Sequence, residues 1–129
     1  MTAFPDGTLT LTATTTADGV LCAALAGDLV WESADELLDA VRARLSAAPG
    51  PSGIRLDCAR MTLCDSTGLS ALLALHRAAE AAGIPLRLDR RPPFLDRLLL
   101  LTGTYGHLTG LPAAAEAEQE ADGPGAPAP

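Results

Sequence analysis

The sequence predicts an α/β fold in which a mixed sheet of four to five strands, opened by a β-hairpin, carries three to four helices. Two observations predict it. Residues 8–26 contain two apolar segments separated by the turn sequence ADG, which is typical of a hairpin. Downstream, segments of helical and strand-like pattern follow one another as helix, strand, helix, strand, helix. That alternation favours parallel strands joined by right-handed crossovers, with helices packed on the sheet.

The strands are predicted from alternation and from the turn residues that bound them. In TLTLTAT (8–14), Thr alternates with Leu or Ala, which is the period of a half-buried strand. VLCAALA (20–26) is the returning strand of the hairpin, and we expect Gly27 and Asp28 to end it. The later strands are expected at 54–59, at 84–88 and, as a short last strand, around Leu108.

The helices are predicted from helical spacing and from capping residues. Ser33 and Glu36 have the spacing of a capping box, so the first helix is expected to begin at Ser33 and to end before PGPSG (49–53). The second is expected to run from the DSTG motif to about Ala82, with Gly83 as a left-handed cap. Its apolar face is expected to hold Leu69, Leu72, Leu73 and His76. The third is expected between Pro93 in its first turn and Gly103 at its end.

Length and charge set limits on the class of protein. The 129 residues are the size of one domain, and they carry a formal net charge of −7 with no Lys. Such a surface repels phosphate backbones and anionic lipid, so we expect neither nucleic acid nor membrane insertion. Residues 112–129 contribute −4 and contain only Pro, Ala, Gly, Glu, Asp and Gln. We therefore predict a folded domain over 1–111 and a disordered acidic tail over 112–129.

The cysteines and the absence of targeting signals favour a reducing compartment. The sequence starts without a basic and then apolar leader, and no apolar stretch approaches the ~20 residues of a membrane helix. Three cysteines are an odd number and lack the spacing of metal ligands. We expect them to act as small hydrophobes in a cytoplasmic protein.

The segment CDSTGLSALL (64–73) crowds Asp65, Ser66 and Thr67 into the start of a helix. A carboxylate or hydroxyl before a helix usually caps it, a contribution of ~1 kcal/mol. One cap residue is enough, so Ser66 is surplus. In the first turn its hydroxyl would be exposed, and the helix terminus would tolerate a phosphate there.

Catalytic interpretations of this segment fail on chemistry. An aspartic protease would need the carboxylate one residue closer to the Gly and a second copy of the motif. A serine hydrolase would need a base, and the two histidines, His76 and His107, have no catalytic motif around them. A phosphate-binding loop needs a Lys. Asp57 lacks the partners of a phospho-accepting aspartate and is expected to order the loop after its strand.

Three segments together resemble the STAS-domain proteins of the bacterial anti-sigma factor antagonist family. IRLDCARMTLCDSTGLSALLALHRAAEAAGIPLRL is similar to the family's strand, variable loop, D-S-[ST]-G-L motif and helix, in order and spacing. LAGDLVWESADELLDAV is similar to its G-E-L-D-x-x-[ST] region, and PPFLDRLLLLTG to its later helix. The resemblance covers about residues 8–111 and implies a STAS-like fold.

The resemblance also implies a role. The family's phosphorylated serine falls on Ser66, with Asp65 before it and Thr67 after it. We expect these three residues, together with Asp28 and Trp31 near the same face, to bind the partner. The implied partner is an anti-sigma factor with serine kinase activity, which the unphosphorylated protein binds so that a sigma factor is freed. Phosphorylation of Ser66 would break this complex, and a protein phosphatase would restore it. The protein would then be a substrate and a binding module, not an enzyme, with no catalytic residue, cofactor or metal.

One departure from the family keeps an alternative open. Val30 stands where the family usually has the Asp of G-E-L-D, and the only Trp, Trp31, follows it. Trp31 is either an interface anchor or a cover for the end of the core. The loss of the acid favours, as the alternative, a non-switching STAS adaptor subunit of a transporter or other multiprotein complex, as in lipid-transport ATPase complexes. A small-ligand sensor or an enzyme is the third class.

Overall fold

The computed structural model describes residues 2–3 and 8–110, and within them five strands and four helices. The chain divides into two compact units, with the boundary between Pro92 and Pro93. The predicted tail, residues 112–129, lies outside the described residues, so the domain limits of 1–111 and 112–129 stay a prediction. In the part of the chain that is described, no helix has the length and apolar character needed to cross a membrane.

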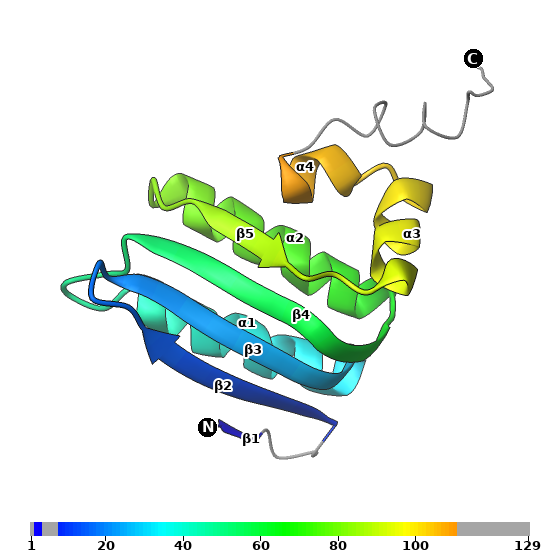
Figure 1. Cartoon of the computed structure of the whole chain (residues 1–129), viewed down its shortest axis with the longest axis horizontal. Helices are drawn as coiled ribbons and strands as arrows, with labels where there is room; N and C mark the ends of the chain where they lie inside the picture. The colour runs from blue at the N-terminus through cyan, green and yellow to red at the C-terminus, as the bar shows by residue number, and fades with distance from the viewer. Residues whose placement is uncertain (1, 4–7, 111–129) are drawn as a thin grey trace. The chain divides into compact units, whose positions relative to one another are not determined.

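The first unit is built on one mixed sheet with the strand order β1-β2-β3-β4-β5 (Figure 1). The pairs β1·β2 and β2·β3 are antiparallel, whereas β3·β4 and β4·β5 are parallel. This confirms the predicted class, a mixed sheet opened by a hairpin. The sequence pattern had not indicated β1. The bounds are β1 Thr2–Ala3, β2 Leu9–Thr15, β3 Val20–Leu29, β4 Gly53–Cys64 and β5 Leu86–Asp89.

β3 does not end at Gly27 and Asp28, as the sequence had suggested, but continues through both to Leu29. Gly27 has φ of +111°, and the register of β3 against β4 shifts on either side of it. A Cβ at Gly27 would lie 2.3 Å from the carbonyl oxygen of Thr8. The same oxygen accepts a 2.7 Å hydrogen bond from the N–H of Asp28. The glycine therefore marks an irregularity inside a strand, where backbones approach closely, rather than its end.

β4 is twice as long as predicted, because its parallel pairing with β3 continues to the pair Leu29–Cys64. The pairing with β5 covers only the first part of the strand, from Ile54 to Asp57. The second part of β4 has exposed residues at Arg60, Thr62 and Leu63 and lacks the apolar alternation that would reveal it.

Two helices, α1 (Trp31–Leu45) and α2 (Ser66–Ala81), lie side by side on the same face of the sheet (Figure 1). Between helices and sheet lies a core of aliphatic side chains. Its fully buried members include Leu9, Leu25, Leu29, Leu37, Val41, Ile54, Leu56, Leu72 and Leu75. The buried face of α2 differs from the predicted one: Leu75 and Ala79 join Leu69 and Leu72, whereas Leu73 and His76 are half-buried. Gly83 has the predicted left-handed conformation after the helix, with φ of +71°.

The second unit contains α3 (Pro93–Leu101) and α4 (Tyr105–Thr109). Pro93 opens α3 and Gly103, with φ of +74°, follows its end, as predicted. The predicted strand around Leu108 is wrong. The N–H of Leu108 donates a 2.9 Å hydrogen bond to the carbonyl of Thr104, which is the i to i−4 pattern of a helical turn.

All three cysteines are free thiols, with Cys22 half-buried and Cys58 and Cys64 buried. Removal from water, reinforced by the neighbouring carboxylates of Asp57 and Asp65, raises the pKa of Cys58 and of Cys64 to about 12. The two buried thiols are therefore neutral apolar groups at ordinary pH, as the sequence had suggested.

These thiols should make the protein less stable in alkali. Unfolded, they ionise near pH 9, whereas the folded protein holds their protons to about pH 12. The raised folded pKa contributes stability that is complete below pH 9 and is lost as the pH rises toward 12. The free energy of unfolding should fall by about 1.4 kcal/mol per pH unit for each thiol. Urea titrations at pH 8 to 10.5 should give a shallower decline for a Cys58→Ala/Cys64→Ala variant than for Cys22→Ala; parallel declines would contradict this.

Candidate functional site

The candidate site lies where the parallel strands β3 and β4 end and lead into α1 and α2. β3 ends at Leu29 and β4 at Cys64, and these two residues pair in the sheet. Trp31 and Ser66 then begin the two helices. Both helices consequently start at the same end of the sheet (Figure 1). The free N–H groups of both first turns, and the positive ends of both helix dipoles, lie at this end.

Asp65 connects the two helix starts. It is the N-cap of α2, and its Oδ1 accepts a 2.8 Å hydrogen bond from the N–H of Gly68. Its Oδ2 accepts a 3.2 Å hydrogen bond from the N–H of Trp31, the first residue of α1. One carboxylate thus satisfies a first-turn N–H of each helix, although 34 residues separate Asp65 from Trp31.

The predicted start of α1 at Ser33 is wrong. The N-cap is Val30, and Ser33 is buried in the first turn. Its hydroxyl accepts a 3.1 Å hydrogen bond from the N–H of Val30 and donates a 2.9 Å bond to the carbonyl of Asp28. With Val30 as the N-cap, Ser33 occupies position N3 and Glu36 lies beyond the capping box, where its Oε1 is buried without a hydrogen-bond partner among the described residues. Ser33 ties α1 back to the end of β3, and Asp65 supplies the cap that Val30 cannot.

Gly68 is required by a close approach between α2 and β3. A Cβ on Gly68 would lie 2.2 Å from the carbonyl oxygen of Leu29 and 3.0 Å from its carbonyl carbon. The same oxygen accepts a 3.2 Å hydrogen bond from the N–H of Asp65. The Gly of the DSTG motif therefore allows the helix to begin directly against the end of the neighbouring strand.

Ser66 and Thr67 are the first two residues of α2, and both are exposed. Neither hydroxyl forms a hydrogen bond within the described ranges 2–3 and 8–110. The capping role belongs entirely to Asp65, so the Ser66 hydroxyl is free to react. Ser66 is thus exposed in the first turn of α2, as predicted, whereas its role as a modification site stays a prediction.

Asp28 and Trp31 lie at the same end of the sheet. The Oδ1 of Asp28 accepts a 2.6 Å hydrogen bond from the hydroxyl of Thr62. Trp31 is 68% exposed, so most of its surface faces solvent rather than the core, which favours the interface interpretation. Leu63, which pairs with Asp28 in the sheet, is 49% exposed and was not a predicted site residue. Its position follows only from the unexpected length of β4.

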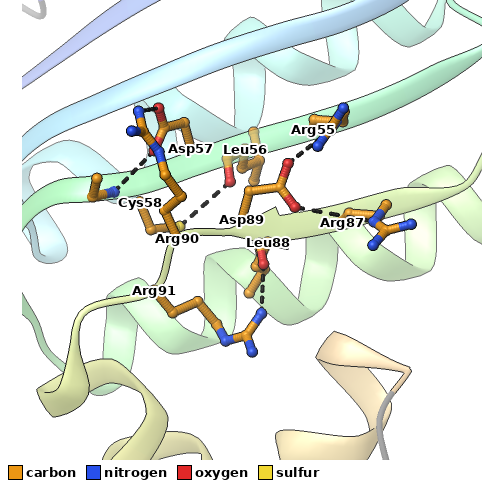
Figure 2. A network of polar contacts seen from close by, with 10 residues as sticks. Arg55, Leu56, Asp57, Cys58, Arg87, Leu88, Asp89, Arg90 and Arg91 are labelled. Atoms are coloured by element: carbon orange, nitrogen blue, oxygen red, sulfur yellow. Dashed lines mark hydrogen bonds and ion pairs between the residues drawn. The ribbon is translucent and has the colours of Figure 1, made fainter.

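A second group of polar residues lies on β4 and β5 (Figure 2). The Asp57 carboxylate accepts hydrogen bonds from the Arg90 guanidinium and from the N–H of Ala59. Asp89 pairs with Arg55 at 2.7 Å. The hydrogen bond from Arg90 holds the pKa of Asp57 below its ordinary value. The prediction that Asp57 orders a loop after its strand is wrong, because Asp57 lies within β4 and bonds to the N–H of Ala59 in the same strand.

This second group borders an open surface pocket of about 430 Å³, which is lined by Cys22, Arg55, Asp57, Asp89 and Arg90. Each of its two carboxylates has an arginine partner, and these ion pairs connect β4 with β5 and with Arg90, which follows β5. In the part of the chain that is described, no group of His, Cys, Asp and Glu is arranged to hold a metal ion.

The comparisons with known proteins agree with this fold. The model of the family described as "Mlab, STAS domain" matches residues 12–110. The chain therefore belongs to the STAS domain family. No curated protein matches the sequence.

Three solved structures are similar. An anti-sigma factor antagonist from Mycobacterium paratuberculosis has 24% identity, a TM-score of 0.62 and coverage of 79% of this chain and 83% of its own. The Bacillus cell fate determinant SpoIIAA in its phosphorylated form has 16% identity, a TM-score of 0.63 and coverage of 86% and 98%. A sulfate transporter family protein from Wolinella succinogenes has 24% identity, a TM-score of 0.60 and coverage of 75% and 76%. At these identities the likeness is one of fold.

Proposed function

We propose that the protein is an anti-sigma factor antagonist that is switched off by phosphorylation of Ser66. The observation that carries the proposal is the exposed hydroxyl of Ser66 at the first position of α2, beside a capping carboxylate that leaves it unoccupied. Its place in the DSTG motif matches the phosphorylated serine of the family. The protein is a substrate and a binding module rather than an enzyme, and it works in the cytoplasm. Asp65, Thr67, Asp28 and Trp31 are the other residues that bind the partner.

The partner is an anti-sigma factor with serine kinase activity. In the transfer, the Ser66 oxygen bonds to the γ-phosphorus of ATP, the bond to the β–γ bridging oxygen breaks, ADP leaves and the hydroxyl proton passes to a base of the kinase. The product carries about −1.5 to −2 charges beside Asp65. Burying this dianion in an interface without a matching cation costs more than the ~1.4 kcal/mol that weakens binding tenfold. A phosphatase reverses the change by hydrolysis.

Incubation with the cognate kinase and ATP should add one phosphate, mapped by mass spectrometry to Ser66. Ser66→Asp should weaken binding to that kinase at least tenfold in calorimetry, because the new charge lies in the contact surface. Ser66→Ala should bind like the unmodified protein and should accept no phosphate.

Thr67→Ala is the matched control, because Thr67 is the neighbouring exposed hydroxyl. It should still be phosphorylated at Ser66. Phosphate found only at other residues, or equal affinities of Ser66→Asp and Ser66→Ala for the kinase, would overturn the proposal.

A non-switching adaptor subunit of a transporter or other multiprotein complex is the second candidate. Two observations favour it: Val30 replaces the acid of the family motif, and the exposed Trp31 gives the surface an apolar character suited to a permanent contact. A transporter family protein is also among the similar folds. Affinity capture from native cells separates the two candidates, since transporter ATPase subunits would favour the adaptor and a histidine-kinase-like ATPase the antagonist.

A further inference from the structure

We propose that Asp65 is a positioning residue through which phosphorylation of Ser66 changes the position of Trp31. The inference rests on the proposed phosphorylation of Ser66 and adds how that modification changes the docking surface. It assigns Asp65 a role beyond capping: phosphorylation displaces its carboxylate from the N–H of Trp31, and the first turn of α1 then loosens.

The two hydrogen bonds of Asp65 are unequal. The bond from Gly68 within the same turn measures 2.8 Å, whereas the bond from Trp31 across to α1 measures 3.2 Å. The first is local and is set by the start of the helix itself. The second depends on the orientation of the carboxylate between two helices. A rotation about the Cβ–Cγ bond moves both carboxylate oxygens together, so the longer bond to Trp31 is the first to exceed hydrogen-bonding distance.

A phosphate on Ser66 supplies the force for such a rotation. It would be attached to the residue next to Asp65 and would repel the carboxylate as a like charge. Its oxygens would also compete for the unpaired N–H groups of the first turn of α2, which is a favourable place for an anion. Held by these N–H groups, the phosphate would stay close to Asp65, and the repulsion would turn the carboxylate out of the orientation in which its Oδ2 accepts from the N–H of Trp31.

Among the described residues, the bond to Asp65 is the one side-chain hydrogen bond that holds the backbone of Trp31. Ser33, the nearest hydroxyl of α1, already bonds to the N–H of Val30 and to the carbonyl of Asp28. The Trp31 side chain is largely exposed and is not anchored in the core. Loss of the Asp65 bond would therefore free the first residue of α1 and the largest apolar side chain at this end of the sheet.

The isolated protein tests this inference without any kinase. Phosphoserine would be incorporated at position 66 during synthesis, and backbone amide exchange would be followed by NMR. The exchange rate of the Trp31 amide should rise at least tenfold on phosphorylation, whereas the amide of Gly83 at the far end of α2, which bonds to Glu80, should not change. Trp31 is the only tryptophan, so its fluorescence anisotropy should fall in parallel.

Variants of Asp65 separate its proposed effect on Trp31 from its role in capping α2. In Asp65→Asn, the amide oxygen can still cap Gly68, but the NH₂ group cannot accept from the N–H of Trp31. Asp65→Ser keeps a good cap and is too short to reach Trp31. In both variants the Trp31 amide should exchange fast already without phosphate, and phosphoserine at 66 should add less than a twofold change.

An unchanged Trp31 amide in the phosphorylated protein would overturn the inference. So would an equal effect of phosphorylation with and without the Asp65 carboxylate. Failure here is distinct from failure of the switch: if phosphoserine still abolishes kinase binding while Trp31 does not respond, the proposed function stands and the transmission through Asp65 is rejected.

Discussion

Replacing Gly68 with alanine is expected to lower the free energy of unfolding by about 3 kcal/mol, at the upper end of the cost of overpacking. The added Cβ would lie 2.2 Å from the carbonyl oxygen of Leu29, so α2 or the end of β3 must shift. Neither moves easily. Leu29 is fully buried and is paired with Cys64, and its carbonyl also accepts the N–H of Asp65.

The sign of this result is informative, because helix propensity acts in the opposite direction. Alanine within a helix is favoured over glycine by ~1 kcal/mol, so a helix without the close approach would gain stability. Chemical denaturation of Gly68→Ala should be compared with Ser70→Ala, an exposed position two residues further along the same helix. Ser70→Ala should stay within about 0.5 kcal/mol of the parent. A Gly68→Ala variant as stable as the parent would contradict the described contact between α2 and β3.

The parts of the fold that sequence analysis predicted correctly depend on local chemistry. Thr–Leu alternation defines β2, and the turn before Val20 defines the hairpin. Pro93 opens α3, and a glycine at positive φ follows α2 and α3. Each of these signals acts within a few residues, so it can be read without knowing the tertiary structure.

The errors arose where distant segments decide the local structure. α1 begins at Trp31 rather than Ser33, because its first N–H bonds to Asp65, 34 residues away. β4 continues to Cys64 because β3 lies alongside it, although its second half lacks the expected alternation. Leu108 belongs to a helical turn rather than a strand, and short apolar segments of this kind do not distinguish the two.

The candidate site was predictable in composition but not in geometry. The surplus of polar side chains at 65–67 predicted that Ser66 is not needed as a cap, and Asp65 alone does form the side-chain cap of α2. The second bond of Asp65, to Trp31, has no counterpart in the sequence pattern. Leu63 was missed because it lies in the half of β4 that was not recognised.

Replacing Trp31 with alanine is expected to weaken partner binding about thirtyfold while leaving the fold intact. An aromatic anchor in the centre of an interface typically contributes 2 kcal/mol or more, which corresponds to this factor. Because the Trp31 side chain is 68% exposed in the free protein, its removal should change the free energy of unfolding by less than about 0.5 kcal/mol. Calorimetric titration against the captured partner and urea unfolding of the same samples measure the two quantities.

The control is Arg44→Ala, which removes an exposed side chain from the last turn of α1, at the opposite end of the helix that Trp31 begins. It should leave the affinity unchanged, since it lies within the same unit but away from the ends of β3 and β4. The result bears on both proposed functions, because the proposed antagonist and the proposed adaptor would each dock through this surface. Only the antagonist should also lose binding through Ser66→Asp. An equal, small effect of the two substitutions on affinity would remove Trp31 from the docking surface and, with it, the main apolar contact proposed at this end of the sheet.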